Sequence, residues 1–310
     1  MLARPAEALP SGRDLVYEPK LDGFRALCRT GPGAALLSRR GADLGPAFPE
    51  IVEALASLPP ALLDGELVAV GSAGCDFAGL CGRLGARGRP ARALGRSAPA
   101  CLVAFDLLEQ GGEDLRPLPL RRRRMRLARL LAGAAGSPAA GLVGLIPQTG
   151  SLAEAERWMA GLTGAGCEGV VAKRASGAYR PGRRDGWVKV RRRHPREYVV
   201  VGMSPRSDGP VALILAARDE RGLRHVGITL PIGGEAGRAL RGALAPLAAA
   251  APTARGSLDR GRFASDRVTD WTPLLPLLVA EVLVDGEDFG QLRHRARLVR
   301  FRPDLDPGGV

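Results

Sequence analysis

The sequence is poor in aromatic residues, in lysine and in long apolar runs. Aromatic residues make up only 4% of the 310 residues, so a ring inside a motif is more informative than usual. The five cysteines are odd in number and contain no CxxC pair, which speaks against a zinc site or a disulfide framework and favours a reducing compartment. The most apolar stretch, residues 274–284, is broken by Pro276 and Glu281 and is too short to cross a bilayer. Because the N-terminal segment MLARPAEALP lacks the apolar core of a signal peptide, we expect a cytoplasmic protein without a membrane partner.

Lysine is nearly absent although the chain is strongly basic. Of the 45 basic residues only Lys20, Lys173 and Lys189 are lysine, and the other 42 are arginine. Arginine stays protonated in proteins, whereas lysine can lose its proton when it is desolvated or surrounded by cations, and it then becomes a nucleophile. Three lysines could also survive by chance in an arginine-biased sequence. The residues around each lysine must therefore decide whether it carries chemistry.

The charge of the chain indicates the kind of partner it meets. The formal net charge is +13 and the isoelectric point is near 10.7. Such an excess favours a polyanion, because each arginine or lysine that neutralises a phosphate releases counterions. A solvated basic surface would have the same composition, so charge alone favours a nucleic-acid partner and establishes none. The balance of 45% hydrophobic and 25% charged residues is that of a globular protein, and the length suits two domains.

Hydrophobic periodicity predicts an α+β organisation for the first part of the chain. Alternating and apolar runs predict strands over residues 15–18, 35–38, 62–63, 67–70, 101–108, 169–172 and 187–190. Helical spacing predicts helices over 47–58, 119–132 and 151–162. Pro59-Pro60 ends the first of these helices, and Ser151 with Glu154 forms a capping box that opens the third. The Gly- and Arg-rich segment 82–99 is predicted to be a loop.

A change of composition at residues 191–195 predicts a domain boundary. Beyond it, strands are predicted over 198–203, 211–217, 225–230, 278–284 and 298–301, with a helix over 235–250. Turn chemistry at 207–210 and 219–222 connects the first three strands. Five short strands with one helix suit a small OB-type barrel. We therefore predict an α+β catalytic domain over 1–193, followed by a C-terminal OB-fold β-barrel over 194–310.

All three lysines fall inside a series of five short motifs. The motifs are EPKLDGFR at 18–25, LDGEL at 63–67, AFDLL at 104–108, EGVVAKR at 168–174 and WVKVR at 187–191. The first contains KxDGxR, and the series resembles, in the same order, the motifs of the covalent nucleotidyltransferases, a superfamily of DNA ligases, RNA ligases and capping guanylyltransferases. The flanks EPKLDGFRAL, VAFDLL, EGVVAKR, YRPG and RFRPDLDP resemble bacterial ATP-dependent DNA ligases related to ligase C and to the ligase module of ligase D.

The resemblance implies a nucleophile and the cations around it. Lys20 would attack the α-phosphate of ATP and carry AMP, which then moves to a 5′-phosphate at a nick before a 3′-hydroxyl displaces it. Lys189 and Arg191 alternate on one face of a strand, so both would reach the α-phosphate and stabilise the charge that develops there. An edge-strand surface cation is the alternative for Lys189. Glu18, two residues before Lys20, is counted with the nucleotide-binding residues.

The resemblance also implies contacts to ribose, base and metal. Glu66 would accept a hydrogen bond from the ribose, and Phe105 would stack on adenine, with a plain core aromatic as the alternative. Glu168 is the first candidate for a metal ligand and Asp22 the second, although Asp22 could merely shape its turn. Magnesium, or manganese in its place, keeps several waters, so two carboxylates suffice beside substrate phosphates.

Four further cations are implied as phosphate contacts. Arg25 and Arg39 resemble the arginines that hold the 5′-phosphate of the nick, and Lys173 could contact phosphate too. The superfamily carries RxDK near its C-terminus, where the motif orients pyrophosphate. Here Arg302 and Asp304 are kept, but Leu305 stands in place of lysine. Self-adenylylation is therefore expected to be slower, unless the arginines of this segment suffice.

The implied partner is nicked or broken duplex DNA at the nucleoid, met by a monomer. Ku-like end-binding proteins or repair polymerases are further expected partners. Only 19 residues precede Lys20, so we expect no N-terminal DNA-binding domain and a salt-sensitive grip on DNA. Two other functions stay open: an RNA ligase, and a DNA-end-binding repair factor with weakened ligase activity. A guanylyltransferase fits the flanks least well.

Overall fold

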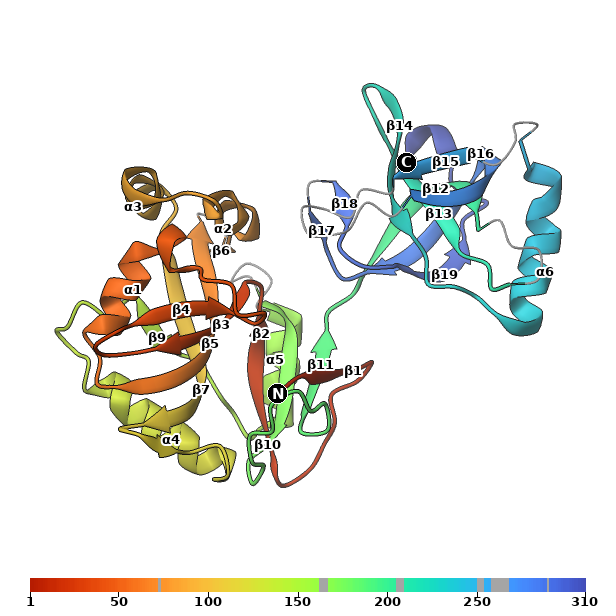
Figure 1. The fold of residues 1–310 in the computed structure, drawn as a ribbon. Helices are drawn as coiled ribbons and strands as arrows, with labels where there is room; N and C mark the ends of the chain where they lie inside the picture. The colour runs from red at the N-terminus through yellow and green to blue at the C-terminus, as the bar shows by residue number, and fades with distance from the viewer. Residues whose placement is uncertain (72–73, 162–166, 205–208, 250–253, 258–267, 289) are drawn as a thin grey trace. The chain divides into compact units, whose positions relative to one another are not determined.

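A computed structural model describes residues 1–71, 74–161, 167–204, 209–249, 254–257, 268–288 and 290–310. The chain divides into two compact units, Met1–Arg192 and Arg193–Val310 (Figure 1). The division falls inside the segment 191–195 where the composition changes. Each unit has a hydrophobic core of its own.

The first sheet of the N-terminal unit has four strands. In spatial order they are β1 (Ala3–Ala6), β11 (Trp187–Arg191), β10 (Cys167–Arg174) and β2 (Leu15–Leu21). β10 is antiparallel to both β2 and β11, and β1 is parallel to β11. Helix α5 (Leu152–Gly161) packs on β2 and β10, where Tyr17, Ala155, Val170 and Ala172 form an apolar cluster. Because side chains alternate along a strand, the opposite face of this sheet is left for polar residues.

The second sheet of this unit is larger and holds the main core. Its path is β4 (Ala35–Ser38), β3 (Phe24–Arg29), β5 (Ala61–Gly71), β7 (Ala100–Gln110) and β8 (Glu113–Asp114), with β6 (Gly74–Cys75) on β5 and β9 (Val143–Leu145) on β7. The helices of this part are η1 (Gly45–Ala47), α1 (Pro49–Ala56), α2 (Phe77–Arg83), α3 (Gly88–Ser97) and α4 (Leu120–Ala132). α2 packs on β5 and α4 on β7, while α3 packs on α1. The core includes the fully buried Phe48, Ile51, Leu63 and Leu102.

The predicted elements of this unit are confirmed except for the loop at 82–99. The strands and the helices near 47–58, 119–132 and 151–162 are present, and the Glu154 N–H donates to the Ser151 hydroxyl at 3.3 Å. The loop prediction is wrong, because α2 extends to Arg83 and α3 spans Gly88–Ser97. Arginine, alanine and leucine are good helix formers, and Ala91 is fully buried on the inner side of α3. The glycines of this segment misled the prediction.

The C-terminal unit contains one main sheet and one long helix. The path of the sheet is β14 (Gly222–Ile228), β13 (Leu213–Asp219), β12 (His194–Met203), β16 (Val268–Val284) and β15 (Ala254–Ser257), and β19 (Arg297–Phe301) pairs with β16. A small hairpin of β17 (Glu287–Asp288) and β18 (Gln291–Leu292) stands apart. α6 (Gly234–Leu244), η2 (Ala245–Leu247) and η4 (Pro307–Gly309) complete the unit. Its core includes Val200, Leu213, Leu215 and Val282.

The predicted strands and helix of this unit are present with shifted boundaries. The turn at 219–222 is confirmed, because Asp219 pairs with Gly222 at the end of a β13–β14 hairpin. The helix predicted over 235–250 ends at Leu244, since Pro246 cannot donate a hydrogen bond to the preceding turn. The strand predicted over 278–284 begins ten residues earlier, at Val268. Residues 207 and 208 of the other predicted turn lie outside the described residues.

The sequence predicts neither disulfide bonds among the cysteines nor a membrane span among the apolar segments. Cys28, Cys81, Cys101 and Cys167 are free thiols, three of them buried, as expected for small core residues. Within the part of the chain that the structure describes, no helix is long and apolar enough to cross a membrane.

Candidate active site

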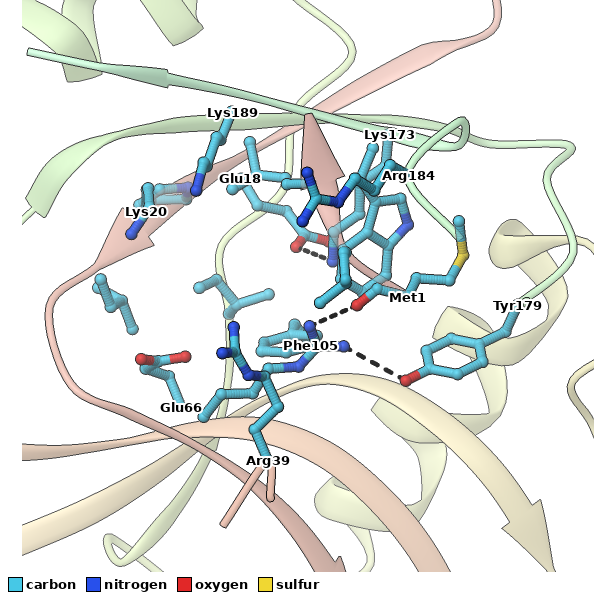
Figure 2. A pocket seen from close by; sticks show the side chains of 18 of the residues that line it. Met1, Glu18, Lys20, Arg39, Glu66, Phe105, Lys173, Tyr179, Arg184 and Lys189 are labelled. Carbon is cyan, nitrogen blue, oxygen red and sulfur yellow. Dashed lines mark hydrogen bonds and ion pairs between the residues drawn. The ribbon is translucent and has the colours of Figure 1, made fainter. Parts of the chain in front are cut away.

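A cavity of about 810 Å³ opens on the polar face of the four-stranded sheet, within the N-terminal unit (Figure 2). This volume is within the range of small-molecule sites. Nine of the residues singled out from the sequence line it: Glu18, Lys20, Arg25, Arg39, Glu66, Phe105, Lys173, Lys189 and Arg191. Seven segments that are far apart in the chain therefore converge on one cavity.

Strand register explains why the cations gather. Lys20 pairs with Gly169, and Gly169 pairs with Arg191 on the other side of β10. Val171 pairs with Glu18 on one side and Lys189 on the other. Residues that are directly opposite in neighbouring strands point to the same face. Lys20, Lys189 and Arg191 consequently share one face of the sheet, as predicted for the two residues of β11.

A bulge in β10 turns Glu168 toward the nucleophile candidate. The pairing of β10 with β2 shifts register between Cys167 and Gly169, which re-aims the intervening side chain. The Glu168 carboxylate pairs with the Lys20 amine, and Arg191 Nε lies 3.8 Å from the same oxygen. Gly169 has φ +156°, and a Cβ there would lie 2.0 Å from the Val190 carbonyl oxygen. Only glycine fits this position, so the bulge depends on it.

The turn after Lys20 brings the second sheet against the first. A Cβ on Gly23 would lie 2.2 Å from the carbonyl oxygen of Leu67, so the absence of a side chain permits close approach of β5. Directly after this turn, Arg25 on β3 pairs with Glu66 on β5. The DG of the first motif therefore places the LDGEL segment opposite Lys20.

Glu18 and Lys173 form a buried ion pair at one end of the cavity. Both side chains are 2% exposed, and Lys173 Nζ lies 2.5 Å from Glu18 Oε2. The ammonium also lies 4.4 Å from the Phe105 ring centre and 4.1 Å from that of Trp187. Gln148 Nε2 donates to the other Glu18 oxygen at 2.7 Å. This end of the cavity is thus aromatic, with one carboxylate and one ammonium held in fixed positions.

Arg25 is tied to a buried carboxylate. Its Nε and Nη2 donate to the two oxygens of Asp64 at 3.0 and 2.7 Å, and the Tyr179 hydroxyl donates to Asp64 at 2.8 Å. Asp64 is fully buried, and an unpaired buried carboxylate would destabilise the fold. The two hydrogen bonds from Arg25 neutralise its charge. Although burial alone would lower the pKa of Arg25, its hydrogen bond to Asp64 raises it.

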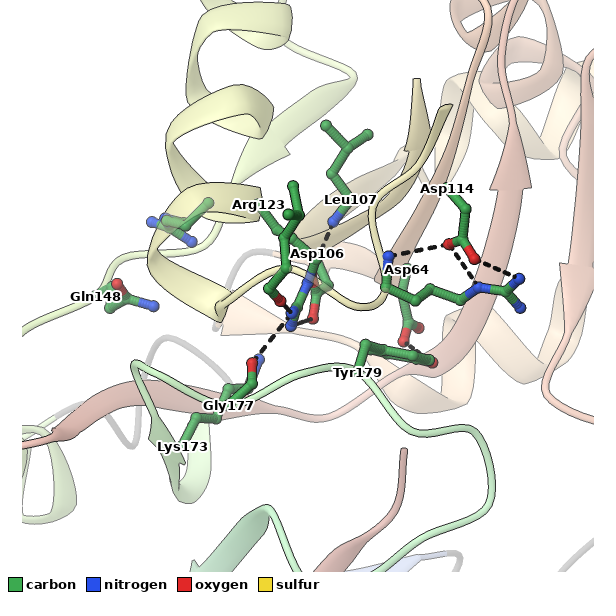
Figure 3. Close-up of polar contacts among 12 residues, drawn as sticks. Asp64, Asp106, Leu107, Asp114, Arg123, Gln148, Lys173, Gly177 and Tyr179 are labelled. Atoms are coloured by element: carbon green, nitrogen blue, oxygen red, sulfur yellow. Dashed lines mark hydrogen bonds and ion pairs between the residues drawn. The ribbon is translucent and has the colours of Figure 1, made fainter. Parts of the chain in front are cut away.

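A second buried ion pair joins Arg123 to Asp106, the residue after Phe105 on β7 (Figure 3). Arg123 of α4 donates from Nε and Nη2 to the two oxygens of Asp106 at 2.7 and 2.9 Å, and both side chains are essentially unexposed. Arg123 Nη1 also donates to the Gly177 carbonyl at 3.1 Å. α4 is thereby joined to β7 next to Phe105 and to the loop that carries Tyr179.

Several acid–base groups of the cavity have perturbed pKa values, among them Glu66 and Lys189. Burial, with the nearby charges of Asp64 and Glu168, raises the pKa of Glu66 to about 8, although Lys20 and Arg25 act in the opposite direction. Burial and the charges of Arg191 and Lys20 lower the pKa of Lys189. Such shifts in one hollow are typical of functional sites.

The raised pKa of Glu66 predicts a pH-dependent contribution to stability. Between about pH 4.5, the ordinary pKa, and about pH 8, the folded protein binds a proton that the unfolded chain has lost. The free energy of unfolding therefore falls as pH rises through this window. Glu66→Gln should remove the loss and be more stable than the wild type by on the order of 2 kcal/mol at pH 8.5, with little difference at pH 4.5.

Urea unfolding at the two pH values measures this effect. Glu53→Gln, which neutralises a carboxylate with a side chain 57% exposed, is the matched control and should follow the wild type at both. A Glu66→Gln variant that gains nothing at pH 8.5 would contradict the prediction.

The cavity leaves out three predicted residues and contains others that were missed. Asp22 and Glu168 do not line it, although Glu168 contacts Lys20 at its edge, and Arg302 belongs to the C-terminal unit. Missed residues that line the cavity include Tyr179, Arg184 and Trp187. Tyr179 lies in the YRPG flank and Trp187 in the WVKVR motif, but neither was given a role from the sequence; Arg184 lies in a loop without periodicity.

Comparisons with known proteins agree on one family. A family model described as ATP dependent DNA ligase domain matches residues 1–191. DNA ligase C of Mycobacterium tuberculosis is 33% identical over 327 residues, which cover 99% of this chain and 90% of that protein. The multifunctional non-homologous end joining protein LigD of Pseudomonas aeruginosa is 37% identical over 237 residues, 73% of this chain and 26% of that protein.

Solved structures agree with this result. The ligase domain of M. tuberculosis LigD matches with a TM-score of 0.50 and 27% identity, over 100% of this chain and 97% of that one. A Lig E DNA ligase matches with a TM-score of 0.57 over 94% of this chain and 93% of its own, and at 19% identity it supports the fold alone. The motifs, the cavity they build and these matches together place the chain: it belongs to the family of ATP-dependent DNA ligases.

Proposed function

We propose that this protein is a DNA ligase that uses ATP to seal 5′-phosphate/3′-hydroxyl nicks or breaks in duplex DNA, with AMP carried covalently on Lys20. The observation that carries the proposal is the position of Lys20. Its amine lies in a cavity ringed by cations, opposite Glu66 and beside Glu168, in a chain of the ligase family. Only a lysine at this position can become neutral and nucleophilic.

The chemistry follows from the positions of the cations. Lys20 Nζ forms a bond to the α-phosphorus of ATP and loses a proton, and the bond from that phosphorus to the pyrophosphate oxygen breaks. Lys189 and Arg191 on the same sheet face stabilise negative charge on the transferred phosphate. AMP then passes from Lys20 to the 5′-phosphate of the nick, and attack by the 3′-hydroxyl releases AMP and joins the strands.

The remaining cavity residues are assigned to contacts with the base, the ribose or a phosphate group. We assign adenine to the aromatic end with Phe105, beside Glu18 and Lys173, and the ribose to Glu66. The Lys173 ammonium lies against Glu18 and two rings, which favours a base contact over the phosphate contact expected from the sequence. Arg39 is the better candidate for the nick phosphate, because the Arg25 fork is bound to Asp64.

A magnesium ion, with manganese as a substitute, would supply charge neutralisation at the transferred phosphate. Among the described residues no group of three His, Cys, Asp or Glu side chains could hold a metal. Glu168 beside Lys20 fits a single protein ligand for an ion held mainly by substrate phosphates. Asp22 does not line the cavity, so its role as a second ligand has weaker support.

We assign an OB-type barrel to the C-terminal unit and the orientation of pyrophosphate to its last motif. The antiparallel strands β12, β13, β14 and β16, with β19 on β16, and the helix α6 support this assignment. Arg302 would act from this unit.

DNA repair is the pathway that we propose. The name of the P. aeruginosa relative, a non-homologous end joining protein, supports it. Ku-like end-binding proteins and repair polymerases are the partners we expect of a monomer working at the nucleoid. The net charge of +13 suits binding to the DNA backbone.

The test is to incubate the protein with ATP labelled at the α-phosphate and with magnesium or manganese. We expect a covalent protein–AMP adduct that nicked DNA discharges as the nick is sealed. Preferential discharge by nicked RNA would instead support an RNA ligase. Binding to DNA ends without any adduct would support the end-binding factor, and labelling by GTP alone would overturn the nucleotide assignment.

A further inference from the structure

Three cations of the cavity have no acidic partner. Lys20 and Arg191 lie against Glu168, Arg25 is held by Asp64, and Lys173 by Glu18. Within the described chain, no ion pair or side-chain hydrogen bond is formed by the other three cations, which come from three different segments: Arg39, Arg184 and Lys189. Like charges that share a hollow repel each other, and an anion between them removes that cost.

Arg184 is the member of this set to which the motifs assign no role. It stands in the loop between β10 and β11 and lines the same cavity as Lys189 and Glu18 (Figure 2). Its charge contributes, after burial and the charges of Arg191 and Lys20, to lowering the pKa of Lys189. Arg184 therefore lies near enough to Lys189 to act on it electrostatically.

The neighbouring arginine shows what an ordinary surface cation looks like in the same loop. Both arginines are exposed, but Arg183 Nη2 lies 3.3 Å from Asp185 Oδ2, and the Arg183 side chain does not line the cavity. With 42 arginines in the chain, a solvated surface charge is the ordinary expectation for any one of them. Position at the cavity and the absence of an acidic partner together separate Arg184 from Arg183.

The arginines of the C-terminal segment are already committed to carboxylates. Arg302 lies 2.7 Å from Asp304 and 3.1 Å from Glu197, and Arg300 lies 2.8 Å from Glu281. An anion that approached them would have to displace these pairs. Arg184 has no acidic partner among the described residues, so no carboxylate there competes with an anion for its guanidinium. The paired N–H donors of a guanidinium match the oxygens of a phosphate group.

We propose that Arg184 is a phosphate-binding residue of the cavity. The inference rests on the proposed function. Two substrates bring phosphate to this place, the triphosphate of ATP and the 5′-phosphate of the nick, and both offer the same chemistry to a guanidinium. Arg184 supplies charge and hydrogen bonds to one of them without taking part in bond making.

The experiment separates the two sources with Arg184→Ala and the matched control Arg183→Ala. One arm measures kcat/KM for protein–AMP formation from labelled ATP without DNA, and the other measures sealing of a pre-adenylylated nick without ATP. Arg184→Ala should lose about 10- to 100-fold in the arm whose phosphate it binds, and Arg183→Ala should stay within about twofold of the wild type in both. Inorganic triphosphate should inhibit adduct formation less well in Arg184→Ala if the nucleotide is the source.

Arg184→Lys shows whether charge is responsible. It should recover part of the loss, because it restores the cation without the fork. Wild-type rates for Arg184→Ala in both arms would overturn the inference, as would a loss that Arg184→Lys does not relieve at all. Either result leaves the proposed function intact as long as the wild-type protein forms its adduct. Failure of the wild type to be labelled would count against the proposed function instead.

Discussion

Replacing Lys20 with arginine is expected to reduce formation of the protein–AMP adduct by at least about a thousandfold. Arginine can keep the ion pair with Glu168 and the positive charge of the cavity, but it does not lose its proton and cannot form the bond to phosphorus. The loss would therefore come from the missing nucleophile and not from altered folding or electrostatics. Labelled ATP followed by electrophoresis measures it directly.

The scarcity of lysine makes it simple to identify which residue carries the AMP label. Peptide mapping needs to distinguish only Lys20, Lys173 and Lys189. Lys189→Arg is the informative comparison, because it should react more slowly yet still carry the label on Lys20. The Lys20→Arg protein should bind nicked duplex as well as the wild type. A label that persists in Lys20→Arg, or that maps to another side chain, would refute the mechanism.

The largest loss of stability is expected from Arg123→Met. The substitution leaves the fully buried Asp106 carboxylate without its fork and removes the donor to the Gly177 carbonyl. Breaking a buried ion pair by removing one partner costs about 3–5 kcal/mol. Urea unfolding should show this decrease in the free energy of unfolding. Arg122→Met, an exposed arginine of the same helix, should change it by less than about 0.5 kcal/mol.

A double variant tests the reason for that loss. Asp106→Leu combined with Arg123→Met removes both charges, so it should recover at least about 2 kcal/mol of the single-variant loss. The Leu107 N–H, which donates to Asp106 at 2.9 Å, limits the recovery because it loses its acceptor. If Arg123→Met cost less than about 1 kcal/mol, the fork would not be what holds α4 to β7.

Local sequence accounts for most of the elements and for the family. Strand alternation and apolar runs predicted β2, β4, β5, β7, β10 and β11 of the N-terminal unit, since each depends on residues close together in the chain, but β1, β3, β8 and β9 were not predicted. Helix α3 was missed because propensity is weak in a short glycine-containing segment, and burial of Ala91 against α1 stabilises it. Pro246 ended α6 where a periodic pattern alone would have continued.

Orientation within the site depended on contacts between distant segments. The sequence predicted that Lys189 and Arg191 share a face, because that follows from strand alternation alone. It could not predict that Lys173 forms an ion pair with Glu18, 155 residues earlier in the sequence, or that Arg25 forms one with Asp64. These pairings depend on the register of β2 with β10 and of β3 with β5.

By itself, the sequence identified the candidate nucleophile, because the difference between lysine and arginine is a property of the side chain and needs no fold. It also determined the family, through motifs whose order the chain preserves. The tertiary structure alone decided which charges neutralise one another. A single bulge at Gly169 turns Glu168 onto Lys20, and a loop without periodicity brings Arg184 to the cavity. Which of the many cations pairs with which carboxylate depends on the distances between their side chains, and these distances are set by the fold.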